Sequence, residues 1–318
     1  MYRVARIVAA VTIAFAAGAV SLTAATPAPT PIPEIAYVGK IPSLHTGALY
    51  TINIDGSARR LITPRGRVTP SSSFSWSPDG TQIVYTRGPL FYAQVVVLNV
   101  DGSGAKRLTS GVLGSSNPTF SPDGKLIAFE REDKNDHRQI WVTNADGTAK
   151  RQLTRSRQFN ASPTWSPDGT KILFERYFNG SRMELWTMTP DGGDKLKIAR
   201  VKTFTDLQGT WWCACPVWSP DGKKIAYEAV TERHKPSIFV MNADGSGRVR
   251  LTFRSSTREE NPDWSPDGTQ IAFYSERFGN AEIVVMNADG TKQRRITHDP
   301  WYDCCPRWKP APTSPPPG

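Results

Sequence analysis

The chain alternates between short apolar runs and polar turns, and this alternation returns about every 45 residues. Each period contains a run that begins with isoleucine and ends with an aromatic residue, followed by a second run such as those at 140–142, 238–240 and 283–285. β-Branched and aromatic residues in runs of this length are typical of strands, and no helical period is visible. The first runs lie at residues 35–37, 83–85, 127–129, 172–174, 225–227 and 271–273.

Two kinds of tight turn separate the runs. Proline presets φ for the first corner of a turn, aspartate caps its own backbone, and glycine takes the positive φ that reverses the chain. Both turns are therefore predicted to be hairpins of antiparallel sheets. Ser-Pro-Asp-Gly occurs at 77–80, 121–124, 166–169, 219–222 and 265–268, and Asp-Gly at 55–56, 101–102, 146–147, 191–192, 244–245 and 289–290.

An aromatic residue precedes each Ser-Pro-Asp-Gly turn, and Trp308 stands in the same phase near the end of the chain. Four strands per period and six periods predict an all-β fold, a six-bladed β-propeller of four-stranded antiparallel blades. An open solenoid is the alternative for any repeat. The chain enters at a second strand, residues 35–38, and leaves at an innermost strand. We therefore expect residues 303–310 to complete the blade begun by residues 34–63 and so to close the ring.

The chain ends predict export and two unstructured segments. Arg3 and Arg6, the apolar run 7–20 and the small residues that follow predict a signal peptide over residues 1–25, cleaved near Ala25. The run is shorter than the roughly 20 residues of a comfortable membrane span, although a retained anchor is the alternative. A Pro-rich linker at 26–33, the propeller at 34–310 and a disordered Pro-rich tail at 311–318 follow. We expect a periplasmic or secreted protein with no membrane span in the mature chain.

The positive net charge of +10 has a local explanation in the repeat. Lysine and arginine recur on the fourth, outermost strand of each period, where they discourage edge-to-edge aggregation. A basic rim of this kind does not form the single groove that nucleic acid requires, so we expect no nucleic-acid partner. The basic positions are 59–60, 106–107, 150–151, 195 with 197, 248 with 250, and 294–295.

The phrase P-x-W-S-P-D-G, followed by a strand and N-A-D-G, resembles the repeat of TolB-type propellers. It stands whole at 163–169, 216–222 and 262–268, and N-A-D-G begins at Asn144, Asn242 and Asn287. The resemblance covers residues 34–310. It implies a periplasmic docking role, although related propellers also serve as gating domains of prolyl-oligopeptidase-like enzymes and as a sugar-lyase scaffold. It further implies a divalent cation in the channel. Only the signal and the linker precede the first strand, so we expect no TolB-like N-terminal α/β domain.

Recognition is predicted on the face that carries the connections from second to third strand and those between blades. These connections vary in length and composition, whereas the repeated turns of the opposite face are nearly identical. Exposed aromatic side chains commonly anchor protein partners. The longest connection, residues 200–215, brings aromatic residues to this face, and 211–218 aligns with 301–308. The predicted partner-binding residues are Phe204, Trp211, Trp212, Trp301 and Tyr302.

The four cysteines fall in these two aligned segments, so that Cys215 and Cys305 occupy equivalent positions. Cys213, Cys215, Cys304 and Cys305 are predicted to form disulfides, because an exported chain meets an oxidising compartment. A bond between the segments would tie the long connection to the closing strand, but the spacing leaves the connectivity open. A four-thiolate metal site is the alternative, without the usual two-residue spacing between its ligands.

The sequence therefore predicts a monomeric propeller that binds a protein partner as a scaffold. No nucleophile, base and orienting group stand at recognisable spacing, and the repeated aspartates are turn residues, so we predict no enzymatic activity and no certain cofactor. The alternative is a metal-dependent lyase or hydrolase of envelope or extracellular polysaccharide, with its site in the central channel. The histidines available to such a site are His45, His137, His234 and His298.

Overall fold

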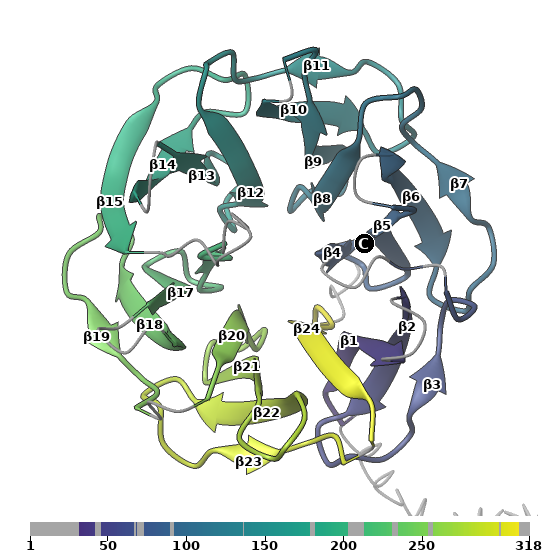
Figure 1. Cartoon of the computed structure of the whole chain (residues 1–318), viewed down its shortest axis with the longest axis vertical. Coiled ribbons are helices and arrows are strands. Elements are labelled where there is room, and N and C mark those ends of the chain that lie inside the picture. Colours follow the sequence, from purple (N-terminus) through teal and green to yellow (C-terminus); the bar gives the residue numbers. More distant parts are fainter. Residues whose placement is uncertain are drawn as a thin grey trace, which may run out of the picture. The chain divides into compact units, whose positions relative to one another are not determined.

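Six antiparallel sheets of four strands stand around a ring (Figure 1), which confirms the predicted fold class. In this computed structural model the residues described are 32–41, 46–66, 68, 73–89, 92–135, 137–178, 182–202, 213–230, 235–253, 257–298 and 300–311. Within these ranges the regular structure consists of strands.

Each sheet forms one blade, numbered from the blade that contains the first strand. From the innermost to the outermost strand, blade 1 consists of β24 (Tyr302–Trp308), β1 (Glu34–Ile41), β2 (Thr46–Asn53) and β3 (Arg60–Leu61), and blade 2 of β4 (Phe74–Trp76), β5 (Gln82–Arg87), β6 (Gln94–Asn99) and β7 (Lys106–Arg107). Blade 3 consists of β8 (Ser115–Phe120), β9 (Leu126–Glu132), β10 (Arg138–Asn144) and β11 (Arg151–Gln152), and blade 4 of β12 (Phe159–Trp165), β13 (Ile172–Tyr177), β14 (Arg182–Met188) and β15 (Leu196–Lys202). Blade 5 consists of β16 (Val217–Trp218), β17 (Lys224–Val230), β18 (Pro236–Asn242) and β19 (Val249–Arg250), and blade 6 of β20 (Glu259–Trp264), β21 (Gln270–Ser275), β22 (Glu282–Asn287) and β23 (Arg294–Arg295).

Blade 1 combines strands from the two ends of the described chain. β24 pairs antiparallel with β1, with Trp308 opposite Ile35 and Tyr302 opposite Lys40. Lys309 Nζ donates to Glu34 Oε2 at 3.0 Å, and Trp76 Nε1 of blade 2 donates to the Arg307 carbonyl at 3.2 Å. The last strand is thus hydrogen-bonded both to the first strand and to the next blade.

The core lies between neighbouring blades. Second and third strands are covered on both faces, which explains why their sequences are continuous apolar runs instead of strict alternations. Tyr37, Phe129, Phe174 and Phe273 hold the same place in four second strands and are fully buried. Burial of each such side chain contributes roughly 1.5–3 kcal/mol relative to its exposure, so the repeated aromatic residue is a main source of stability.

The repeated turns satisfy their own polar groups. In the turn after β4, Ser77 Oγ donates to Asp79 Oδ1 at 2.5 Å, and Gly80 N donates to the Ser77 carbonyl at 2.9 Å. The same bonds recur in the other four Ser-Pro-Asp-Gly turns. The hydrogen bond from Ser77 lowers the pKa of Asp79. These aspartates therefore stabilise hairpins, as predicted.

The basic residues of the rim do more than protect edges, because three arginines bind the neighbouring blade. Arg151 Nη1 donates to the Asp191 carbonyl at 2.9 Å, and Arg248 Nη1 donates to the Arg200 carbonyl at 2.8 Å. Like Arg151, Arg294 donates to a turn of the next blade, in this case from blade 6 to the Ile54 carbonyl of blade 1. The rim charge thus also ties outer strands to the turns and strands beside them.

Replacement of Gly245 by alanine is expected to destabilise the fold by about 2 kcal/mol more than replacement of Gly279, because overpacking costs about 1–3 kcal/mol. Both glycines have positive φ, 87° and 95°, so the conformational strain of the two substitutions is matched. A Cβ at Gly245 would lie 2.3 Å from the Ile198 carbonyl oxygen, whereas no described atom lies within 4 Å of one at Gly279. Urea midpoints of the two variants measure the difference, and equal midpoints would contradict the packing.

Candidate functional site

The direction of the strands divides the ring into two faces. The Ser-Pro-Asp-Gly turns and the Asp-Gly turns lie on one, here called the uniform face, since they follow the first and the third strand of each blade, which run in the same direction. The connections from second to third strand and those between blades lie on the other, the variable face. Its fully described connections, at residues 108–114, 153–158 and 276–281, differ in sequence and length.

The exposed large apolar side chains are distributed unequally between the two faces. None of those in the described part of the chain lies in a repeated turn of the uniform face. Ile32 precedes the first strand, and Leu61, Leu196 and Val249 lie on outermost strands. The remaining four lie in connections of the variable face: Tyr92, 63% exposed, Val112, 78%, Phe253, 73%, and Phe278, 38%.

Hydrogen bonds hold Tyr92 and Val112 near one another at the junction of blades 2 and 3. Gln94 Nε2 donates to the Tyr92 carbonyl at 3.2 Å and to the Gly111 carbonyl at 3.3 Å. Ser115 N donates to the Ala93 carbonyl at 2.7 Å. The two connections therefore run side by side and present both apolar side chains to solvent.

Arginines flank the two exposed phenylalanines of blades 5 and 6. The Arg250 guanidinium lies 5.2 Å from the centre of the Phe253 ring, and those of Arg277 and Arg295 lie 5.0 and 4.7 Å from the centre of the Phe278 ring. Buried glutamates orient the last two, since Arg277 Nη1 lies 4.0 Å from Glu259 Oε1 and Arg295 Nη2 lies 2.5 Å from Glu282 Oε1. Arginine stacked on an aromatic ring offers both apolar area and charge-assisted hydrogen bonds.

The sequence-predicted aromatic residues divide into two groups. Phe204, Trp211 and Trp212 lie outside the described residues. Trp301 and Tyr302 are half-buried where blade 6 meets blade 1: Asn280 Nδ2 donates to the Trp301 carbonyl at 2.7 Å, and the Tyr302 ring packs 5.8 Å from that of Tyr274. Tyr302 is therefore held in place rather than freely presented. Sequence reasoning missed Tyr92, Val112, Phe253 and Phe278, whose only signal was an apolar residue inside a predicted connection.

The cysteines form no bond between the two segments, a connectivity that the sequence left open. Cys213 pairs with Cys215, while Cys304 and Cys305 remain buried thiols. This differs from the prediction that all four take part in disulfides. The physical reason is that blade 6 separates the segments: Asn261 of its innermost strand, β20, donates Nδ2 to Cys215 Sγ at 3.0 Å.

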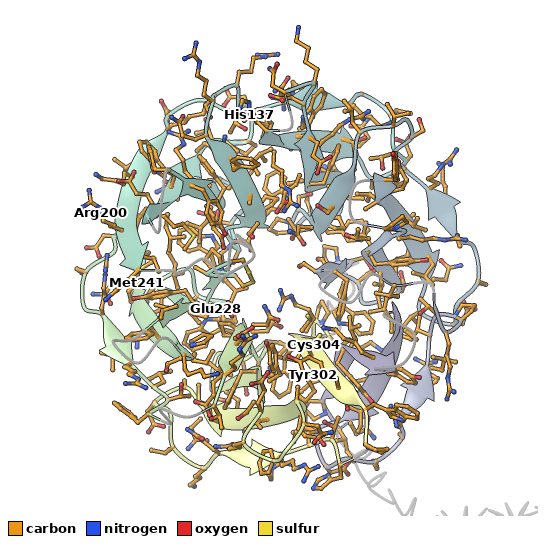
Figure 2. All side chains as sticks on the ribbon, viewed as in Figure 1. His137, Arg200, Glu228, Met241, Tyr302 and Cys304 are labelled. Carbon is orange, nitrogen blue, oxygen red and sulfur yellow. A yellow bond between two sulfur atoms is a disulfide. The ribbon has the colours of Figure 1, made fainter. Side chains whose placement is uncertain are left out.

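Buried glutamates connect the blades around the channel, and Figure 2 shows Glu228 on the channel side of blade 5. Glu130, Glu175 and Glu228 directly follow the buried aromatic residue of β9, β13 and β17. Each accepts a backbone N–H from the innermost strand of the next blade or the segment that leads into it: Ser162 to Glu130 at 2.6 Å, Cys215 to Glu175 at 2.8 Å and Asn261 to Glu228 at 2.7 Å. Burial raises the pKa of Glu175 to about 7 and that of Glu228 well above its usual value.

The donor N–H groups belong to a shared irregularity of the innermost strands. The residue three places before the aromatic residue that ends the innermost strand has positive φ in five of the six blades. The pairing register between the innermost and second strands shifts there in four blades. In blades 3 to 6 the rotated residue points its N–H into the preceding blade. The five rotated residues are Asn117, Ser162, Cys215, Asn261 and Cys305.

Within the part of the chain that the structure describes, the candidate ligand group does not fit the divalent cation that the family resemblance implies. Among the described residues, the group with ligand atoms close enough for a metal is Cys213, Cys215 and Glu228, within 4.8 Å of one another. Its two sulfurs are bonded to each other, which leaves no thiolate to coordinate an ion. His137 packs edge-on against Phe159, and His298 Nδ1 lies 3.2 Å from the Ile296 carbonyl oxygen; His45 and His234 lie outside the described residues.

A cavity of 660 Å³ lies on the uniform face between blades 4 and 5. Pro167, Leu196, Trp218 and Pro220 line it. It forms beside β15, which has seven residues where each of the other outermost strands has two. This cavity is the competing binding surface of the molecule.

Six blades with uniform turns on one face and varied connections on the other define a six-bladed β-propeller with one differentiated face. The family model described as the TolB beta propeller domain matches residues 40–212 and 195–314. The chain therefore belongs to the TolB β-propeller family, as its repeat predicted.

Individual relatives resemble parts of the chain or its fold. The structure of TolB from Acinetobacter baumannii superposes with a TM-score of 0.73 at 22% identity, over 88% of this chain and 67% of that one. An uncharacterized protein of Agrobacterium fabrum is 36% identical over 94 residues, 30% of this chain and 31% of its own. The uncharacterized peptidase YuxL of Bacillus subtilis is 33% identical over 101 residues, 30% of this chain and 15% of its own. The chain thus matches less than a third of either curated relative.

Across the part of the chain that the structure describes, no helix has the length and apolar character that crossing a bilayer requires.

Proposed function

We propose that this TolB-like propeller is an exported scaffold that binds a protein partner through its variable face and the mouth of its channel. The observation that carries the proposal is the placement of Tyr92, Val112, Phe253 and Phe278, all exposed and all in variable-face connections. Periplasmic or extracellular location rests on the predicted signal peptide and on the family.

The chemistry of these side chains suits a protein surface. Aromatic residues and arginine dominate the binding energy of protein interfaces, and each well-placed anchor is worth 2 kcal/mol or more, about a thirtyfold change in affinity. Phe253 with Arg250, and Phe278 with Arg295, supply two such combinations within blades 5 and 6, while the side chain of Arg277 is only 8% exposed and supports the Phe278 ring. Trp211 and Trp212, which lie outside the described residues, are predicted from the sequence to belong to the same face.

Affinity capture from envelope extract tests the proposal with matched variants. We expect the double variant Phe253→Ser with Phe278→Ser, and separately Trp211→Ala with Trp212→Ala, to recover the wild-type partner at least tenfold less well. The control is Leu196→Ser with Val249→Ser, which removes two side chains that are 62% and 55% exposed but lie on outermost strands, one of them at the competing cavity.

The control is expected to recover the partner as wild type does. All the substituted phenylalanines, Leu196 and Val249 are exposed, so melting temperatures should stay within a few degrees of wild type. Equal recovery by every variant, or loss only in the Leu196 and Val249 control, would remove the variable face from the proposal.

A further inference from the structure

Cys304 and Cys305 are neighbours in sequence, and their side chains meet. In a regular strand adjacent side chains point to opposite faces of the sheet. Cys305 instead has φ of 58°, and the pairing of β24 with β1 shifts register between Ala36 and Val38. The rotation brings the two sulfurs to 3.0 Å, with the Cys305 thiol donating to Cys304 Sγ, and both side chains are buried.

Cysteine is not among the residues that favour positive φ, yet it holds this position in blades 1 and 5, at Cys305 and Cys215. Asparagine, which tolerates positive φ well, holds the equivalent place in blades 3 and 6, at Asn117 and Asn261. The recurrence of this conformation in five of the six blades indicates that the fold imposes it, and the local sequence supplies two adjacent thiols to it. The sulfur pair is thus set by the fold and not by the preference of the Cys-Cys dipeptide.

Cations and hydrogen bonds make the two sulfurs chemically unequal. Burial alone would raise the pKa of Cys304, but the hydrogen bond from Cys305 and the Lys40 ammonium of β1, which also hydrogen-bonds the sulfur, bring it down to about 7, with a further contribution from Arg307. The hydrogen bond that Cys305 donates, together with burial, raises the pKa of Cys305 well above its usual value. The lowered pKa of Cys304 makes it the thiol of the pair that ionises first, while the raised pKa of Cys305 keeps that residue protonated.

Three further ionisable groups lie around the pair: Glu260, Tyr302 and Tyr274. None of them carries a positive charge that would stabilise the thiolate. Glu260 of β20 is buried and interacts with both Cys304 and Lys40, and its own pKa rises to about 7, chiefly through burial. Tyr302 lies beneath Lys40, whose Nζ is 4.6 Å from the ring centre, and Tyr274 hydrogen-bonds Glu260. Lys40 is the cation that hydrogen-bonds Cys304. Figure 2 shows Cys304 and Tyr302 near one another on β24.

We propose that Cys304 and Cys305 form a redox-active vicinal dithiol that exchanges with low-molecular-weight disulfides. The Cys304 thiolate attacks one sulfur of the disulfide RSSR, forms a mixed disulfide and releases RS⁻, which takes up a proton. Cys305 then attacks Cys304 Sγ as its proton passes to the second leaving RS⁻. The sum is two protein thiols plus RSSR giving one Cys304–Cys305 disulfide and two RSH, so the small disulfide is reduced and the protein oxidised.

The site suits a small disulfide and not a protein one. The counterparts of Cys305 in blades 3 to 6 are partly exposed, whereas Cys305 itself is only slightly so. The burial of Cys304 and Cys305 excludes a folded protein partner, so a small disulfide is the reactant that the proposal requires. Reactivity therefore depends on the intact ring.

Oxidised glutathione tests the exchange in the full-length protein with Cys213→Ser and Cys215→Ser, so that only the vicinal pair remains. After reduction and desalting, we expect folded protein to release two glutathiones and to lose two hydrogens from the peptide that contains both cysteines. With Cys305→Ser added, one glutathione should stay bound. Glutathione adducts on both cysteines, or reaction only after unfolding in urea, would overturn the proposal.

The pH dependence of alkylation by iodoacetamide tests the role of Lys40. The rate on Cys304 in the Cys305→Ala background is compared with that in Lys40→Met and Lys40→Arg derivatives. Lys40→Met is expected to move the midpoint of the rate profile upward by at least one pH unit, and Lys40→Arg to leave it nearly unchanged. A purely structural lysine would change neither midpoint, so coincident profiles in all three proteins would overturn this arrangement.

Discussion

Deletion of residues 302–318 is expected to abolish the cooperative unfolding transition of the propeller. The deletion removes β24, so that β1 loses the partner that pairs it from Ile35 to Lys40. It also removes Trp308, a buried residue of the core cluster that blade 1 shares with blades 2 and 6. Loss of a single buried tryptophan side chain costs about 3–5 kcal/mol, which is comparable to the whole stability of many domains.

Circular dichroism melting of the deletion variant measures this effect against two controls. Deletion of residues 312–318 removes only residues outside the described part and should leave the melting curve unchanged. Trp308→Ala keeps the β24 backbone and should melt between the two. A transition for the 302–318 deletion within a few degrees of wild type would mean that the pairing of β24 with β1 does not hold the ring together.

The strands could be predicted because their determinants are local and repeated. The hydrogen bonds within the turn from Ser77 to Gly80 join residues that are close in sequence, and the same turn occurs five times in the chain. The assignment of Trp308 to an innermost strand needed only its phase relative to the other aromatic residues. Repetition thus supplied the long-range information that a single segment lacks.

The site was harder to predict from the sequence, because the contacts that form it join different blades, and the repeat makes these blades look equivalent. Glu175 accepts N–H bonds from Ala214 and Cys215, which lie some forty residues away and follow the longest connection. The meeting of Cys304 with Cys305 depends on a φ of 58° that no local pattern announces. A glutamate after the buried aromatic residue in three blades was the available signal, and it could have been read as a buried carboxylate.

The buried glutamates predict a protein that becomes less stable as pH rises from 5 to 8. Burial raises the pKa of Glu175 from 4.5 to about 7, so the folded state retains a proton that the unfolded state has already lost. A folded state that binds more protons loses stability with rising pH, and this contribution is largest below the unfolded pKa and gone above the folded one. At about 1.4 kcal/mol per pKa unit, Glu175 contributes a decrease of about 2 kcal/mol across this range.

Glu175→Gln isolates that contribution, because it keeps an oxygen for the N–H groups of Ala214 and Cys215 and an uncharged partner for Tyr177. Free energies of unfolding from urea titrations at pH 5, 6, 7 and 8 should show the variant gaining about 2 kcal/mol on wild type as pH rises. Subtracting one protein from the other cancels groups common to both, including Cys304 and Asp263. Glu132→Gln, at the end of β9, is the matched control and should run parallel to wild type. A constant offset between Glu175→Gln and wild type at all four pH values would show that Glu175 is ionised in the folded protein.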